Sequence, residues 1–238
     1  MTTERRLLAT LAGRFELDST AIERLDLLAQ RSVSLEISGT ALHTREDAMR
    51  FHIADSLAGL ELAAIRAAED LVDIGSGVGF PGLVLAIARP DLSVTLVDSV
   101  RKKTEAAAEF ARELGLGNVE TVWSRVEDFS AIGGSARESF DVVSVRALAS
   151  LPVLVEYAAP LLRVGGTLAA WKGDPPLDEL ADARAATAAL GFAAGELIAT
   201  TPFTGSRRRH FYVAEKLGRS PERFPRRAGT ARRKPIKA

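Results

Sequence analysis

Short apolar runs alternate with amphipathic stretches through the middle of the chain. Runs that are apolar on successive residues are typical of strands buried on both faces of a sheet; they cover residues 71–74, 94–97, 119–123, 141–145 and 167–171. The stretches between them have helical periodicity; they cover residues 81–89, 100–114, 151–162 and 177–190. Strands that alternate with helices predict an α/β fold with a doubly wound, mostly parallel sheet.

The first part of the chain has a helical pattern. Thr20 and Glu23 have the spacing of a capping box before an apolar stretch. A second helix is predicted from about Thr44, because apolar side chains recur at the spacing of one buried helix face; they are Met49, Ile53, Leu57 and Leu60. We therefore expect residues 1–68 to form a helical N-terminal cap before the α/β domain.

Near the C-terminus the pattern changes again. Residues 197–201 and 209–216 are separated only by a loop, which predicts a hairpin that adds one antiparallel strand to the sheet. After residue 217 the composition turns to Pro, Gly and Arg, which predicts a basic extended or disordered tail over residues 218–238. The α/β domain is then expected to cover residues 69–217.

The composition excludes several classes of protein. Of the 238 residues, 47% are hydrophobic and 26% are charged, as in globular proteins. Cysteine is absent, which excludes disulfide scaffolds, thiolate metal sites and thiol nucleophiles, and three scattered His predict no metal site. No apolar run approaches the ~20 residues of a membrane helix, and the beginning of the sequence has no signal-peptide pattern. We expect a cytoplasmic protein without membrane contact.

The net charge of zero hides an asymmetry. Residues 207–238 contain 12 Lys and Arg but only two Glu, so the rest of the chain is acidic. A basic end on an acidic body favours a polyanionic partner such as nucleic acid, whereas a solubilising tail is the alternative that charge alone leaves open. The sequence leaves the oligomeric state open, with a monomer favoured.

The strongest chemical signal is a glycine-rich turn over residues 71–82, Leu-Val-Asp-Ile-Gly-Ser-Gly-Val-Gly-Phe-Pro-Gly. A buried strand ends in this turn, and a helix begins at Pro81, which suits the first helical position. Without side chains at Gly75 and Gly77, the backbone can pass close beneath a ligand that faces the N–H groups of the helix start. The turn therefore predicts a cofactor site.

Two cofactors are compatible with this turn. Gly77, Gly79 and Gly82 also satisfy the dinucleotide pattern, so a nicotinamide-dependent oxidoreductase remains an alternative. Asp73, two residues before the first glycine, gives an order that resembles the first motif of S-adenosylmethionine (SAM) methyltransferases. The helical region before the turn also argues against a dinucleotide, and SAM is the cofactor that we favour.

Acidic residues after the next two strands complete the expected cofactor site. Asp98 ends the second strand and can accept hydrogen bonds from the ribose hydroxyls of either cofactor. Glu127 and Asp128 follow the third strand, where class I methyltransferases hold the adenine. A solvated loop is the alternative interpretation of these two acids.

The motifs that the sequence lacks narrow the choice of methyl acceptor. The fourth strand ends in Arg146 and Ala147, without the Asn/Asp-Pro-Pro-aromatic run of enzymes that methylate exocyclic amino groups. Methylation of pyrimidine C5 needs the absent cysteine. N7 of guanine carries no proton, so positioning is the main requirement, although oxygen and small-molecule acceptors remain open. Arg146 and Lys172 are candidates for positioning the substrate, with a surface ion pair as the alternative for Arg146, and no catalytic residue is assigned.

A cluster on one predicted helix suggests a different chemistry. His52, Asp55 and Ser56 lie within one helical turn, so their side chains would point side by side, which is not the arrangement of a hydrolytic triad. We expect a structural role for this cluster, such as binding of the neighbouring loop.

Six short segments, taken in order, resemble one family; they are Arg50-Phe-His-Ile-Ala-Asp-Ser-Leu, Asp73-Ile-Gly-Ser-Gly-Val-Gly-Phe-Pro-Gly, Asp98-Ser, Ser124-Arg-Val-Glu-Asp-Phe, Val145-Arg-Ala-Leu-Ala-Ser and Trp171-Lys-Gly. Together they are similar to the bacterial ribosomal RNA small subunit methyltransferase G family, also called glucose-inhibited division protein B. Residues 224–230 are similar to the end of many members, whereas the segment from Gln30 to Thr44 departs from the family pattern.

The resemblance implies a class I SAM-dependent methyltransferase that methylates N7 of one guanine in 16S rRNA, guanine 527 in the conventional rRNA numbering. Residues 69–217 would be the SAM-binding domain, and the basic C-terminal region would contact the rRNA or the small ribosomal subunit. The cofactor-binding residues combine the glycine turn with the family's motifs; they are Gly75, Gly77, Phe80, Asp98, Val126, Glu127 and Arg146. Phe80, Val126 and Arg146 rest on the resemblance alone. A ribosome assembly factor with this fold but without turnover is a further alternative.

Overall fold

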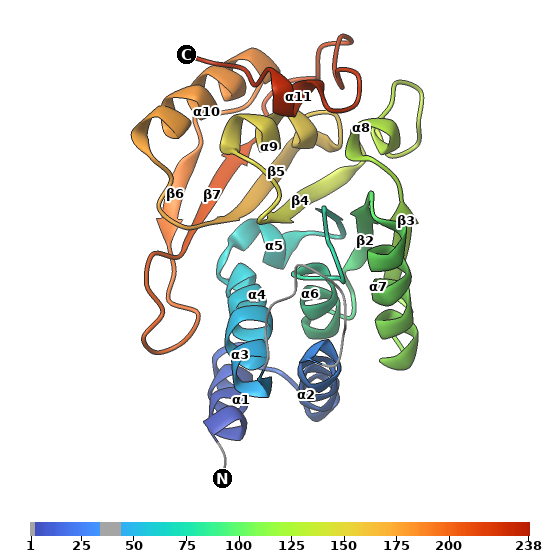
Figure 1. Ribbon diagram of the computed structural model, residues 1–238, viewed down its shortest axis with the longest axis vertical. Helices are drawn as coiled ribbons and strands as arrows, with labels where there is room; N and C mark the ends of the chain where they lie inside the picture. The colour runs from blue at the N-terminus through green and yellow to red at the C-terminus, as the bar shows by residue number, and fades with distance from the viewer. Residues whose placement is uncertain (1–2, 34–43) are drawn as a thin grey trace.

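The computed structural model describes residues 3–33 and 44–238, which form a seven-stranded sheet with helices on both faces (Figure 1). The strands lie in the order β3-β2-β1-β4-β5-β7-β6. Their bounds are β1 (Asp70–Ile74), β2 (Ser93–Asp98), β3 (Val119–Trp123), β4 (Phe140–Arg146), β5 (Leu162–Lys172), β6 (Glu196–Ala199) and β7 (His210–Glu215). The segment 34–43, which holds most of the stretch that departs from the family pattern, lies outside the described residues.

The helices precede, separate and follow these strands. Before the sheet lie α1 (Thr3–Arg14), α2 (Ser19–Val33), α3 (Arg45–Asp47), the π-helix η1 (Ala48–Ala54), α4 (Asp55–Leu57), the 3₁₀-helix η2 (Ala58–Glu61) and α5 (Ala63–Ala67). Within and after the sheet lie α6 (Gly82–Ala88), α7 (Arg101–Glu113), α8 (Val126–Phe129), α9 (Leu151–Ala158), α10 (Leu177–Leu190) and α11 (Thr230–Arg233). No helix in the described ranges combines the length and the apolar character that crossing a membrane requires.

The topology confirms the predicted α/β fold. Strands β1 to β5 pair in parallel, and β1 lies between β2 and β4. Strand β7 runs antiparallel to both of its neighbours, β5 and β6, so the closing hairpin contributes the one antiparallel strand that the sequence predicts. The strand order reverses next to β1, which has β2 on one side and β4 on the other. The loops after β1 and β4 therefore diverge and leave a crevice at the carboxyl ends of these strands.

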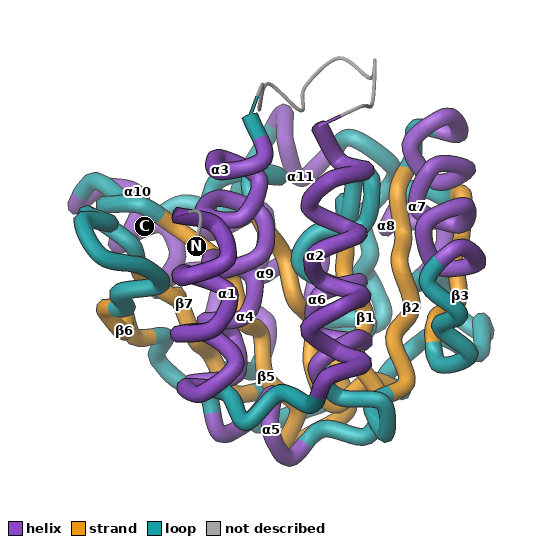
Figure 2. Tube along the Cα trace, turned by 90° about the horizontal axis from the view of Figure 1, so that it is seen from below, coloured by secondary structure: helices purple, strands orange, loops and turns teal. Residues whose placement is uncertain are grey.

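Side chains alternate between two hydrophobic clusters, one on each face of the sheet. Leu71 and Leu96 belong to the first cluster, which also contains the apolar faces of α1, α2, α6 and α7. Val72 and Val97 point the other way, into a second cluster with α9 and α10. Figure 2 shows the cap helices α1, α2 and α4 on the same side of the sheet as α6. The cap therefore completes one face of the sheet and shares its core.

The helix predicted from Thr44 forms, but its geometry changes along its length. Met49, Ile53 and Leu57 are fully buried, as the spacing predicts. The run begins as an α-helix, continues as a π-helix over Ala48–Ala54, returns to an α-helix at Asp55–Leu57 and ends as a 3₁₀-helix. The spacing of the apolar side chains does not reveal such a change, because positions four residues apart lie on nearly the same face in an α-helix and in a π-helix.

Residues 218–238, for which the composition predicts an extended or disordered tail, pack against the body of the protein. Phe224 and Ala231 are buried in the second core cluster, and the segment contains the short helix α11 (Figure 1). At its start, the buried Lys216 donates from Nζ to Ser220 Oγ at 2.8 Å. The average composition of the segment is basic and Pro-rich, and that average conceals the two apolar anchors.

Candidate active site

Two cavities open where the parallel strands end. The first, the glycine-loop pocket, has a volume of about 430 Å³ and is lined by the loops after β1, β2, β3 and β4 and by the C-terminal segment. The second, the arginine pocket, has a volume of about 220 Å³ and is lined by residues of α4, the ends of β4 and β5 and the start of β7. Ala147 lines both pockets, so they are neighbours across the backbone that follows β4.

The structure brings five of the predicted cofactor residues together in the glycine-loop pocket; they are Gly75, Gly77, Asp98, Val126 and Glu127. The other two, Phe80 and Arg146, do not line it. Phe80 is buried beneath His52, whose ring stacks on it at 4.3 Å between centroids. Arg146 lines the arginine pocket together with Lys172, which places both candidates for substrate positioning in one cavity.

The glycine turn has the backbone geometry that only glycine adopts readily. Gly75 has a φ of 65°, and a Cβ there would lie 2.6 Å from Leu148 Cδ1. Gly77 has a φ of 60°, and a Cβ there would meet no described atom within 4 Å, so this side of the turn faces open space. The turn therefore has no room for a side chain at Gly75, next to Leu148, whereas it is open toward the pocket at Gly77.

Two aspartates hold the turn in place. Asp98 accepts hydrogen bonds from the N–H of Gly77 at 2.9 Å and of Val100 at 2.8 Å, one on each carboxylate oxygen. A carboxylate can accept about four hydrogen bonds, so Asp98 retains lone pairs for a ligand. Asp73 is completely buried and accepts from the N–H of Gly82 at 2.9 Å, and its burial raises its pKa to about 7. Asp73 therefore connects β1 to the start of α6 and does not line the pocket.

Another wall of the pocket comes from two distant parts of the chain. Glu127, near the start of α8, accepts a hydrogen bond from the N–H of Gly229 at 2.7 Å. Arg232 of α11 donates to the carbonyl oxygen of Leu148 at 3.1 Å. Burial, and then the nearby Glu127 carboxylate, raise the pKa of Tyr157, which lines the same wall. Sequence reasoning missed Gly229 and Arg232, because it assigned their segment to an extended or disordered tail.

Arg146 is bound on several sides by the helical segment before the sheet. Its Nη1 donates to Phe51 O at 2.9 Å and to Asp55 Oδ2 at 3.1 Å, and its Nη2 lies 3.3 Å from His52 Nδ1. Burial, and then the positive charge of Arg146, lower the pKa of His52 to about 4. His52 is therefore neutral at pH 7, and its Nδ1 accepts from Arg146. The surface ion pair considered for Arg146 is instead a largely buried one.

The charges of the arginine pocket are predominantly positive. Asp55, whose side chain is only 6% exposed, is the one carboxylate among the described residues that line it, and Oδ1 of Asp55 lies 3.6 Å from Arg209 Nε. Lys172 pairs with Glu179 at 2.8 Å. His52, Asp55 and Ser56 all approach Arg146, so they form an arginine-binding cluster with the structural role that we expect, and not a hydrolytic triad.

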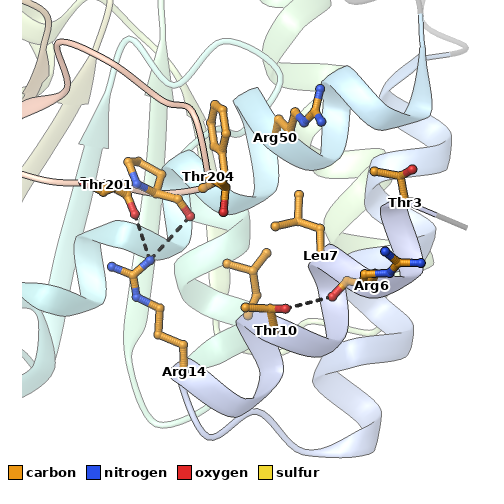
Figure 3. A pocket seen from close by; sticks show the side chains of 11 residues that line it. Thr3, Arg6, Leu7, Thr10, Arg14, Arg50, Thr201 and Thr204 are labelled. Carbon is orange, nitrogen blue, oxygen red and sulfur yellow. Dashed lines mark hydrogen bonds between the residues drawn. The ribbon is translucent and has the colours of Figure 1, made fainter.

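A third cavity of about 340 Å³ lies between α1 and the β6–β7 loop, and we call it the α1 groove. Figure 3 shows Arg14 of α1 beneath the loop, with Thr201 and Thr204 above it. Arg14 donates to Thr201 O at 3.0 Å, which ties the loop to the cap. No set of three or more potential metal ligands gathers among residues 3–33 and 44–238.

Comparison with known proteins identifies the family. The sequence profile of the rRNA small subunit methyltransferase G family matches residues 25–211. A protein of that name from Deinococcus radiodurans is 43% identical over 202 residues, which cover 83% of this chain and 78% of the relative. Another from Desulfitobacterium hafniense is 37% identical over 223 residues, 93% of this chain and 92% of the relative. The chain belongs to the rRNA small subunit methyltransferase G family.

Solved structures with a similar fold include SAM-dependent methyltransferases. The SAM-dependent methyltransferase SibL has a TM-score of 0.58 at 15% identity, covering 90% of this chain and 74% of that protein. An O-methyltransferase of Thermotoga maritima has a TM-score of 0.51 at 15% identity, covering 71% and 66%. At such identities the likeness shows the fold alone, the class I methyltransferase fold. With membership of the methyltransferase G family, it establishes SAM as the cofactor and sets aside the nicotinamide alternative.

The glycine-loop pocket of this methyltransferase G family member fits SAM. Its volume of about 430 Å³ falls within the range of roughly 300–1,000 Å³ of small-molecule sites. Gly77 leaves room for a ligand beside the turn, and Asp98 keeps acceptor capacity for hydroxyl groups. Val126 and Leu148 supply apolar surface for a flat ring, and Glu127 supplies an acceptor beside them.

The environment of His52 leads to a prediction about pH. Nuclear magnetic resonance titration of the histidine side chains should give His52 a pKa of about 4. Because this pKa lies below the unfolded value of 6.5, neutral His52 stabilises the fold fully above pH 6.5, and this contribution is lost as the pH falls toward 4. Arg146→Met should raise the pKa of His52, but not to 6.5, because burial is the larger cause. A His52 pKa near 6.5 in the unmodified protein would contradict this environment.

Proposed function

We propose that the protein transfers the methyl group of SAM to N7 of guanine 527 of 16S rRNA in the small ribosomal subunit. Membership of the methyltransferase G family supports an rRNA substrate. The observation that carries the choice of N7 is the arginine pocket, which adjoins the glycine-loop pocket at Ala147 and whose one carboxylate, among the described lining residues, is engaged by guanidinium groups. N7 is an acceptor that needs no base.

The residues of the glycine-loop pocket can each take one part of the cofactor. Asp98 would accept hydrogen bonds from the ribose hydroxyls through its remaining lone pairs. Gly75 and Gly77 would leave the backbone accessible to the methionine part. Val126 would pack on the adenine, and Glu127 would accept from its exocyclic amino group.

Phe80 and Arg146 would support this site from outside the pocket. Phe80 lies under the His52 ring, and the Arg146 guanidinium lies 5.8 Å from the centre of the Phe80 ring. They would hold the cap against the strand ends and so fix the position of Ala147. Lys172 and Arg209 would bind the phosphate or sugar of the target nucleotide, since both line the arginine pocket.

The chemistry of N7 methylation suits this pocket. SAM supplies an electrophilic methyl group on a sulfonium ion, and the N7 lone pair forms the new N–C bond as the S–C bond breaks. No proton leaves guanine, so the pocket has to orient the purine and not to activate it. The positive charge of the sulfonium ion moves to the purine ring in this step.

The experiment that tests the function is a methyl-transfer assay on unmodified small subunits with radiolabelled SAM. The modified rRNA is then treated with borohydride and aniline, which cleave the chain at 7-methylguanine. We expect label in the rRNA and cleavage at guanine 527. Label without cleavage would contradict N7, and cleavage elsewhere would contradict the site. SAM binding without any transfer would favour the assembly factor.

The β6–β7 loop is the basic element nearest to the arginine pocket, and we assign the rRNA contact to it. Arg207 and Arg208 are exposed in this loop, and Arg209 follows them at the edge of the arginine pocket. The loop continues into the α1 groove, where Figure 3 shows Arg50 and Arg6 at the rim. Phosphates that flank the target nucleotide can follow this line of guanidinium groups. The loop thus takes over the role that the sequence assigned to the whole basic C-terminal region.

Asp98 gives the most direct test of the cofactor site. Asp98→Ala should weaken SAM binding by about 1.5–3 kcal/mol, because it removes acceptors for the ribose and releases the Gly77 N–H. Calorimetric titration with SAM measures the dissociation constant. Asp128→Ala is the matched control, since Asp128, the second acid expected near the adenine, is exposed on α8 and does not line the pocket. An unchanged dissociation constant for Asp98→Ala would remove this residue from the site.

The rRNA contact predicts a change in salt dependence. The double substitution Arg207→Ala and Arg208→Ala should reduce the slope of log affinity against log salt by roughly 1.4–1.8, about 0.7–0.9 for each lost phosphate contact. Fluorescence anisotropy with an rRNA fragment at several salt concentrations measures this slope. The control pair Lys102→Ala and Arg112→Ala removes the same charge from α7, on the opposite side of the molecule (Figure 1). Equal slopes for both double variants would exclude the loop.

A further inference from the structure

The C-terminal segment, residues 218–238, is anchored to the body by buried groups. Arg226 donates from Nε to Glu156 Oε1 at 2.7 Å and from Nη2 to Oε2, and the Glu156 side chain is only 3% exposed. Phe224 is 4% exposed within the second core cluster. Detachment would leave a carboxylate of α9 buried without its cation, which is strongly unfavourable. The docked state is therefore the ground state of the segment.

The docked segment reaches the glycine-loop pocket at two points. The Gly229 N–H donates to Glu127 Oε1 at 2.7 Å, and Arg232 Nη2 donates to Leu148 O at 3.1 Å. Both Gly229 and Arg232 line the pocket. Gly229 has a φ of 77°, which directs its N–H into this contact at a position where other residues are strained.

These two contacts act on two different residues that line the pocket. The Gly229 N–H engages one oxygen of Glu127 and so fixes the direction in which the other oxygen faces. Arg232 holds the backbone of Leu148, whose side chain packs against the turn at Gly75. The width of the pocket and the orientation of its acid therefore both depend on the docked segment.

We infer that residues 218–238 form the closing wall of the SAM pocket, with Gly229 and Arg232 as positioning residues, so that docking of the segment and binding of SAM are coupled. The inference rests on the proposed placement of SAM in the glycine-loop pocket. It differs from the expectation from the sequence, in which this segment is an extended or disordered tail and part of the basic region that contacts the rRNA. Three of its cations are engaged by the body, namely Arg219, Arg226 and Arg232.

Single substitutions in the full chain test the coupling. Arg232→Ala and Arg226→Ala should each raise the dissociation constant of SAM at least fivefold in calorimetric titrations. Arg233→Ala is the matched control, because Arg233 is an exposed cation of the same helix, and it should leave the constant within twofold of the original. Arg232→Lys should recover part of the affinity, since Lys can donate to Leu148 O. Circular dichroism establishes that each variant is folded.

Binding of an rRNA fragment by the same variants distinguishes a segment that forms a pocket wall from a segment that binds RNA. If the segment is a pocket wall, Arg232→Ala weakens SAM binding and leaves the RNA affinity within twofold. If Arg232→Ala and Arg233→Ala weaken RNA binding equally and leave SAM binding unchanged, the segment is an RNA contact and the inference is wrong. Unchanged SAM binding in both Arg226→Ala and Arg232→Ala also overturns it.

Limited digestion with trypsin provides a second readout that does not depend on substitutions. Coupling is reciprocal, so a ligand that requires the docked segment must also hold it in place. SAM at saturation should slow cleavage after Arg223, Arg227 and Arg233 at least threefold, with little effect on cleavage after Arg207 in the β6–β7 loop. Equal cleavage rates with and without bound SAM would contradict the coupling. A protein that binds no SAM at all would refute the proposed function itself, which the titration of the unmodified chain reveals separately.

Discussion

Asp55 connects the helical cap to the sheet, and the arrangement of the site depends on it. One carboxylate oxygen of Asp55 accepts from Arg146 at the end of β4, and the other faces Arg209 next to β7. Its backbone carbonyl accepts from Trp171 Nε1 of β5 at 2.8 Å. A carboxylate that is only 6% exposed needs both guanidinium partners, because an unpaired buried charge is very unfavourable. The cap therefore cannot move away from the strand ends without exposing or orphaning this group.

The topology of the sheet places the glycine-loop pocket and the arginine pocket side by side. The order β2-β1-β4 makes the loops after β1 and β4 diverge, and the crevice between them contains the glycine turn and Ala147. Ala147, with a φ of 54°, adopts a strained conformation for a residue with a side chain, and it separates the two pockets. In the proposed reaction, the methyl group has to cross only this short boundary. The π-helix η1 presents Phe51 O and His52 to Arg146, and so stiffens the same boundary from the cap side.

Periodicity and local motifs predicted the sheet, its hairpin and most of the glycine-loop pocket. Buried strands have a distinct apolar pattern, and closely spaced glycines indicate a turn with the backbone geometry that only glycine adopts readily. Gly75, Gly77 and Asp98 could therefore be found from their neighbours in the sequence. Their assignment to SAM contacts remains a prediction. Arg146 was correctly placed at the end of the fourth strand, but its partners lie more than 90 residues earlier, and no local pattern reveals such pairing.

Contacts between residues far apart in the sequence also explain where the structure differs from the other sequence-based expectations. Residues 218–238 were interpreted from their composition, in which eight cations outweigh two apolar anchors. The Gly229–Glu127 contact spans 102 residues, and the donor is a backbone N–H that every residue except proline has. The start of β5 at Leu162, five residues earlier than expected, reflects pairing with Phe140 of β4 through a register shift. Tertiary pairing overrides local preference at these points.

A crystal structure of the full chain with S-adenosylhomocysteine, the demethylated product of SAM, tests the central claim most directly. The account predicts the ribose on Asp98, the adenine between Val126 and the docked residues 229–232, and the sulfur directed past Ala147 toward the arginine pocket. It would be contradicted by a ligand bound in the α1 groove, or by a sulfur that faces away from Ala147. It would also be contradicted by residues 218–238 detached from a fully occupied pocket.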